Sequence, residues 1–143
     1  MIKLTEIAKS KTAVDDSLTL AFDLRQKSRF SATTDKGKAV GLFYSRGQIL
    51  RSGLILTGVD DYKVQIKAAD EAVSIMSNHD SLAFARACYH LGNRHVSLQI
   101  LATELRYLTD HVLDQMLEGL GFQVEHKILA FEPEPGAYHS HDH

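Results

Sequence analysis

The sequence predicts an α+β protein in which a small all-β amino-terminal domain precedes a ferredoxin-like βαββαβ domain and a mobile, histidine-containing tail. Three observations support this prediction. Residues 1–68 have the pattern of short strands joined by turns, whereas residues 69–132 alternate between strand-like and helical patterns. Residues 133–143 contain both prolines of the chain and three of its histidines, which is typical of an irregular segment.

The strands of residues 1–68 are predicted from alternating apolar and polar residues and from the turn residues between them. Residues 17–25 place Leu18, Leu20, Phe22 and Leu24 at every second position, so they predict one half-buried strand. Two hairpins are expected, one joining residues 30–34 to 39–44 through a turn at Gly37 and one joining residues 53–58 to 62–68. No helix is expected in this half.

The second half changes to a mixed pattern. Residues 71–77 predict a strand, after which Asn78 or Asp80 can cap a helix that ends at Gly92. Its apolar face is expected at Leu82, Ala85 and Tyr89.

A hairpin and a second helix follow. Residues 96–101 and 104–108 predict the hairpin, and Thr109 or Asp110 can cap a helix that ends at Gly121. The apolar face of this helix is Leu113, Met116, Leu117 and Leu120. Residues 122–131 predict the last strand, which completes the βαββαβ order.

Composition excludes several classes of protein. The 143 residues suit one domain or two very small ones, and no apolar run approaches the about 20 residues that a membrane helix needs. The amino terminus lacks a secretory signal pattern, so we expect a cytoplasmic protein. The formal charge of −2 gives no reason to expect nucleic acid as a partner. The single cysteine, Cys88, cannot form an internal disulfide or a CxxC zinc site, and we expect it to be a buried small residue.

The eight histidines are the unusual feature of the composition. His95 follows the predicted end of the first helix, where a side chain can reach outward. Spacing alone favours a surface or hydrogen-bonded histidine, because one imidazole is too few for nickel, copper or zinc. In a two-fold dimer, however, two His95 side chains could face one ion, and His139, His141 and His143 could complete the site or bind an ion separately.

The remaining histidines give weaker signals. His111 lies in the first turn of the second helix, where the helix dipole favours the neutral imidazole that metals require, although a solvated polar residue explains it as well. We interpret His90 and His126 as structural or hydrogen-bonded residues, and His79 carries little signal.

No catalytic constellation is present in the sequence. There is no GxSxG elbow, HExxH pair or glycine-rich phosphate loop, so the chain is not expected to be an enzyme. A metal-dependent hydrolase would need carboxylates beside His95. The basic residues at 25–29 could bind an acidic partner or could simply be a solvated strand end.

Longer stretches of the chain resemble a known family. "CYHLGNRHVSLQI", "ELRYLTDHVLDQML" and "FEPEPGAY" followed by histidines are similar to the metal-binding domain of the UreE family, the nickel chaperones of urease assembly. "LRQKSRF", "GLFYSRGQILRSG" and "KVQIKAADEAV" resemble the amino-terminal domain of that family, which has been likened to a peptide-binding module of chaperones.

The resemblance implies a homodimer that forms through the ferredoxin-like domain. His95 matches the histidine that binds nickel together with its symmetry mate. His139, His141 and His143 match auxiliary ligands, and His111 matches a histidine that some members use for a peripheral metal. Many relatives have proline where this chain has Ser97, and several have a long polyhistidine tail. We therefore expect about one interfacial ion per dimer rather than nickel storage.

The expected function is nickel delivery for urease assembly. Ni(II) is the cargo, Cu(II) or Zn(II) could bind in vitro, and the implied partners are the urease accessory GTPase and the apourease assembly complex. The alternative is a peptide-binding or scaffolding module with incidental metal binding.

Overall fold

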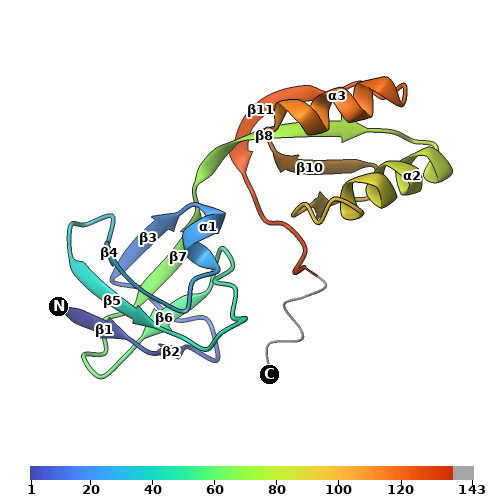
Figure 1. The fold of residues 1–143 in the computed structure, drawn as a ribbon. Coiled ribbons are helices and arrows are strands. Elements are labelled where there is room, and N and C mark those ends of the chain that lie inside the picture. Colours follow the sequence, from blue (N-terminus) through green and yellow to red (C-terminus); the bar gives the residue numbers. More distant parts are fainter. Residues whose placement is uncertain (137–143) are drawn as a thin grey trace. The chain divides into compact units, whose positions relative to one another are not determined.

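The computed structural model describes residues 1–136. Within them the chain forms two compact units, of which the first spans Met1–Ala69 and the second begins at Asp70. The first is built mainly from strands and the second mixes helices with strands, which confirms the predicted α+β class (Figure 1). In this part of the chain no helix has the length and apolar character needed to cross a membrane.

The first unit contains two small sheets. Their strands are β1 (Ile2–Leu4), β2 (Glu6–Ile7), β3 (Asp16–Leu20), β4 (Arg29–Thr33), β5 (Ala39–Phe43), β6 (Ile55–Thr57) and β7 (Val64–Ala68). The strand orders are β1-β5-β4 and β2-β6-β7-β3. Both predicted hairpins are present, because β4 pairs antiparallel with β5 and β6 pairs antiparallel with β7. Gly37 takes the expected positive φ of 89° in the first turn.

Most strands of the first unit contribute one or two residues to its core. It contains Leu4, Leu18, Leu20, Val40, Leu42, Leu50, Leu56, Val64 and Ile66, all of them buried.

The prediction of one strand over residues 17–25 is wrong in its second half. The strand β3 ends at Leu20, and Phe22–Arg25 forms the short helix α1, so the expectation of no helix in this half is also wrong. Phe22 is buried from the helical turn just as it would be from a strand, so the alternating pattern did not distinguish the two.

Arg25 is the least expected member of this core. It is 0% exposed, its Nε donates to the Leu20 carbonyl at 3.0 Å and its Nη1 donates to the Leu50 carbonyl at 3.3 Å. Its guanidinium also lies 5.4 Å from the centre of the Phe22 ring. Arg25 therefore ties three segments together, and the interpretation of it as part of a solvated or partner-binding basic cluster is wrong.

The second unit has the predicted ferredoxin-like topology. Its elements are β8 (Asp70–Ser77), α2 (Ser81–Gly92), β9 (Gln99–Ile100), β10 (Glu104–Leu108), α3 (His111–Gly119) and β11 (Glu125–Ala130). The four strands form one antiparallel sheet in the order β11-β8-β10-β9. Both helices lie against one face of this sheet (Figure 1). Two strands are shorter than the sequence patterns predicted. These are β9, the first strand of the predicted hairpin, and β11, the last strand of the unit.

Helix boundaries follow the predicted capping residues. The Asp80 carboxylate accepts from the backbone N–H groups of Leu82 and Ala83, and α2 ends at Gly92 as expected. Asp110 caps α3 in the same way, and Gly121, with φ of 93°, follows the end of that helix.

The predicted apolar face of α2 is wrong. Leu82 and Tyr89 are 57% and 65% exposed, whereas Ala87 and Leu91 are buried. The helix "SLAFARACYHLG" has apolar residues around most of its circumference, so two stripes compete, and the sheet selects the one that contains Ala87 and Leu91. Leu120, predicted on the apolar face of α3, is likewise 47% exposed.

Candidate metal site

His95 lies in a tight turn at the end of α2. The backbone N–H groups of Asn93, Arg94 and His95 bond to carbonyls three or four residues earlier, so the last turn of the helix is closed. His95 itself has φ of 58°, a left-handed conformation that few residues other than glycine adopt. Its side chain is exposed. The turn therefore presents an imidazole to solvent from a hydrogen-bonded base.

The chain after β11 returns toward the segment that carries His95. Residues 131–134, which we call the crossing segment, are bonded to the opposite edge of the sheet. The Glu132 N–H donates to Gln99 Oε1 at 3.0 Å, and the Glu134 N–H donates to the Leu98 carbonyl at 2.7 Å. The last strand was expected to end at Phe131 and the tail to begin at residue 133, so these contacts were missed. The large apolar side chain of Phe131, which is fully buried, was the signal in the sequence that could have pointed to them.

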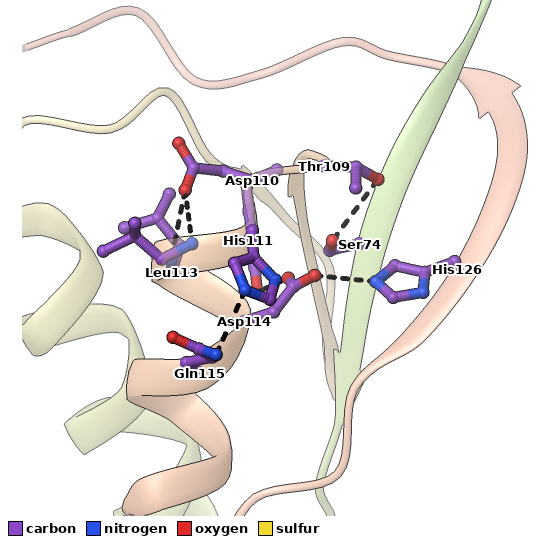
Figure 2. A network of polar contacts seen from close by, with 10 residues as sticks. Ser74, Thr109, Asp110, His111, Leu113, Asp114, Gln115 and His126 are labelled. Atoms are coloured by element: carbon purple, nitrogen blue, oxygen red, sulfur yellow. Dashed lines mark hydrogen bonds and ion pairs between the residues drawn. The ribbon is translucent and has the colours of Figure 1, made fainter.

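His111 is the first residue of α3 and is exposed. Its Nε2 lies 3.1 Å from the amide nitrogen of Gln115, one turn further along the helix (Figure 2). Because an amide nitrogen only donates, the ring nitrogen accepts this bond, and an ion would have to displace Gln115 to bind there.

His126 takes part in a network that fastens α3 to the sheet. Its Nε2 lies 2.7 Å from Asp114 Oδ2 (Figure 2). The Tyr107 hydroxyl donates to Asp114 Oδ1 at 2.6 Å. Beside them the Ser74 hydroxyl donates to the hydroxyl of Thr109 at 3.4 Å. The contact with Asp114 confirms the interpretation of His126 as a hydrogen-bonded residue.

The network fixes the charge of Asp114. Burial acts to raise the pKa of its carboxyl, but the hydrogen bonds from Tyr107 and His126 outweigh that effect and hold the pKa below its ordinary value. Burial, aided by the Asp114 carboxylate, raises the pKa of Tyr107. Tyr107 therefore stays a neutral donor to an ionised acceptor, and sequence spacing had not indicated this pair.

The other candidate donors are dispersed. His79 is exposed before α2, and His90 is half-buried with its ring centre 5.3 Å from that of Tyr89. Cys88 is half-buried rather than fully buried, and burial raises the pKa of its thiol, which disfavours the thiolate that metals bind.

Within residues 1–136, no three His, Cys, Asp or Glu side chains are grouped so that they could hold a metal ion. His95 and His111 are therefore not brought into a common donor cluster there. The predicted ligands His139, His141 and His143 lie outside the described residues.

Comparison with known proteins covers both units. The family described as the N-terminal domain of the UreE urease accessory protein matches residues 2–69, and the family described as its C-terminal domain matches residues 71–143. A urease accessory protein UreE from Alkalilimnicola ehrlichii is 56% identical over 138 residues, which cover 96% of this chain and 85% of that protein.

Two further relatives carry the same name. The one from Escherichia coli O157:H7 (strain EC4115 / EHEC) is 46% identical over 100% of this chain and 96% of its own length. The one from Tolumonas auensis is 49% identical over 98% of this chain and 77% of its own length. With both domains matched in order and nearly the whole chain aligned, this protein belongs to the UreE family of urease accessory proteins.

Proposed function

We propose that this protein is a cytoplasmic nickel metallochaperone. A homodimer binds Ni(II) as cargo at its interface and delivers the ion, through the urease accessory GTPase, to the apourease assembly complex. The observation that carries the proposal is His95, an exposed imidazole held on a hydrogen-bonded turn in a left-handed conformation. The name of the relatives, urease accessory protein, supports the role in urease maturation.

The need for a dimer follows from the number of donors. The described residues of one chain offer no group of three donors, whereas ions bound by imidazole take about four to six ligands. A two-fold axis beside His95 would double each donor near it. In the proposed site the two His95 imidazoles hold the ion, and His139, His141 and His143 complete its shell. His111 would bind a second, peripheral ion after displacing Gln115.

An exposed site suits a carrier. Ligands at a surface can be replaced one at a time by donors of a partner, so the ion can be passed on without unfolding either protein. Imidazole also binds copper and zinc, and the general order of affinities places copper above nickel. We therefore expect Cu(II) or Zn(II) to compete in vitro. The protein is proposed to move the ion and not to catalyse a reaction.

The direct test is His95→Asn, studied by calorimetric titration with nickel. Asparagine tolerates the left-handed conformation of residue 95, so the variant removes the imidazole with little backbone cost. His79→Asn is the matched control, because His79 is another exposed histidine near an end of α2. The tightest site should weaken by at least about tenfold in His95→Asn alone, since even residues that only orient a ligand contribute about 10- to 100-fold.

Stoichiometry completes this test. Sedimentation of the wild type should give a dimer that binds about one tight nickel ion. Unchanged tight binding in His95→Asn, or the same affinity in a monomer, would overturn the proposal.

One observation favours the alternative of a peptide-binding module. The first unit contains an open cavity of about 500 Å³ lined by Thr5, Ile7, Arg29, Phe43, Tyr44, Ser45 and Gln48. The Arg29 guanidinium lies 5.9 Å from the centre of the half-exposed Phe43 ring, an arrangement that can receive a carboxylate. If this were the main function, nickel affinity would be micromolar or weaker and independent of dimerisation.

A further inference from the structure

We propose that a cavity beside α2 binds a segment of a partner protein in which a carboxylate lies next to an apolar side chain. The cavity, which we call the α2 cavity, has a volume of about 460 Å³ and is lined by Asn78, by Ala83, Arg86 and His90 of α2, and by residues 120–122. It lies within the second unit and shares no lining residue with the cavity of the first unit. The inference goes beyond nickel delivery and does not depend on it.

One wall of the α2 cavity is a single side of the helix. Ala83, Arg86 and His90 are spaced by three and four residues, so their side chains lie one above another along α2. Arg86 lies six residues before Gly92, where the helix ends, which is roughly 9 Å along the helix axis. The cavity is therefore separate from the turn that carries His95.

The other wall is the turn that follows α3. The Phe122 N–H donates to the Leu117 carbonyl at 3.0 Å and the Gly121 N–H donates to the Glu118 carbonyl at 3.0 Å, so the backbone of this turn is closed. Gly121 has the positive φ of 93° that the closure requires, and Phe122 packs against the core under the helices. Both walls are therefore formed before a ligand arrives, which lowers the entropic cost of binding.

The polar side chains of the lining are suited to an anion. Arg86 is exposed and, among residues 1–136, no hydrogen bond or ion pair joins its guanidinium to another group. Asn78 Oδ1 accepts from the Asp80 N–H at 2.8 Å, which leaves the amide nitrogen of Asn78 to donate. No carboxylate of the described residues lines the cavity. An arginine in such a setting can form two parallel hydrogen bonds with one carboxylate of a ligand.

Exposed apolar side chains lie around this arginine. Leu120 is 47% exposed on the turn after α3, and Leu82 and Tyr89 are 57% and 65% exposed at four residues before and three residues after Arg86. All three were expected in the core, and the core leaves them at the surface. Arginine and aromatic side chains are enriched at protein interfaces, and exposed leucines supply apolar area that a partner can bury.

The form of the cavity favours a protein segment over a small molecule. Sites for small molecules enclose most of the ligand surface, whereas this cavity is open and the helix beside it carries exposed apolar residues. A peptide can place one carboxylate at Arg86 and extend its neighbouring apolar side chains over Leu82 and Leu120. The occupant that fits is therefore an acidic and apolar segment of another protein.

The test uses two short peptides as probes in metal-free buffer. Acetyl-Leu-Glu-Leu-amide carries the carboxylate, and acetyl-Leu-Gln-Leu-amide is its neutral match. Binding to the isotope-labelled full chain is followed by nuclear magnetic resonance at the Gly121 amide and the Arg86 Nε–H. The glutamate peptide should shift both signals and bind at least about tenfold tighter than the glutamine peptide, because hydrogen bonds to a charged acceptor are roughly twice as strong as neutral ones.

Two matched variants separate the role of the Arg86 guanidinium from that of surface charge. Arg86→Gln and Lys127→Gln each remove one positive charge from an exposed position. Lys127 pairs with Val73, three residues from the core residue Met76, so strand alternation places Lys127 on the face away from the helices. Arg86→Gln should reduce the preference for the glutamate peptide to less than about twofold, whereas Lys127→Gln should keep it. Glutamine is a good helix former, and circular dichroism checks that α2 is retained.

The remaining outcomes would overturn the inference. Equal binding of both peptides to the wild type, or binding that leaves the Gly121 amide unshifted, would show that the α2 cavity does not select a carboxylate. Hexanoate binding as tightly as the glutamate peptide would make the cavity a site for small carboxylates. Loss of self-association in Arg86→Gln, measured by sedimentation, would make the occupant a second copy of this chain. None of these results bears on the nickel site, which is tested separately by His95→Asn.

Discussion

Replacing Asp114 with asparagine should destabilise the second unit by about 2–3 kcal/mol at pH 7. The buried carboxylate accepts one short hydrogen bond on each oxygen, at 2.6 Å from Tyr107 and 2.7 Å from His126. Hydrogen bonds to a charged group contribute about 1.5–3 kcal/mol each. Asparagine keeps one carbonyl acceptor but loses the charge and the second acceptor, so roughly one such bond is lost.

The pH dependence of stability distinguishes the contribution of the Asp114 charge from that of side-chain packing. The pKa of Asp114 lies below its ordinary value of 3.8 in the folded state, so the unfolded state binds the proton first as pH falls. The stability that the carboxylate contributes is thus fully present above about pH 4 and is lost as pH falls through the lower folded pKa. The difference between wild type and Asp114→Asn should therefore shrink in that range.

Urea unfolding followed by circular dichroism at 222 nm is a suitable assay, because α2 and α3 contain most of the helical residues described. Glu118→Gln, at an exposed position of α3, is the control and should change stability by less than about 0.5 kcal/mol. The reasoning would be refuted if Asp114→Asn were as stable as this control. A stability difference that stayed constant from pH 7 to pH 3 would refute the electrostatic part.

Three further substitutions test the first unit by urea unfolding and hydrogen exchange of β7. Arg25→Met should cost about 2–4 kcal/mol because it leaves buried carbonyls without their donor, whereas Lys27→Met at an exposed position should be nearly neutral. Gly58→Ala should cost about 3 kcal/mol or more, since the added Cβ would lie 2.0 Å from the Lys3 carbonyl oxygen. Gly37→Ala has open space around it, so only its φ of +89° matters, and the expected cost is about 1–2 kcal/mol. A fully stable Gly58→Ala would show that β1 can move away freely.

Periodicity and capping residues were enough to predict most of the fold. Asp80, Asp110 and Gly121 act at the positions that local chemistry indicates, and Gly37 forms the expected turn. Where a segment fitted two patterns, tertiary packing determined which structure it adopted. Phe22 is buried equally well by a strand or by a helical turn, so the end of β3 could not be read from its alternation.

The sequence pointed to individual histidines as candidates, but it did not indicate which residues they contact. His126 was expected to be hydrogen-bonded, yet nothing in its spacing pointed to Asp114. The contact joins α3 to β11, and it forms only when the helix packs against the sheet. The contact of Gln99 with Glu132 likewise depends on the order of the strands. A buried arginine such as Arg25 contradicts the usual exposure of charged residues, and its carbonyl acceptors become available only when the core forms.

The strand order of the second unit also has a kinetic consequence. The central strand β8 pairs with β11 in a register that joins Ile75 to Glu125 and Asp70 to Ala130, so this pairing closes a long loop of chain. Such non-local contacts form slowly, because the entropy of loop closure is lost before the contacts are gained. We expect β11 to add late in refolding, with the crossing segment docking after it. Substitutions in residues 131–134 should then speed unfolding and leave the folding rate nearly unchanged.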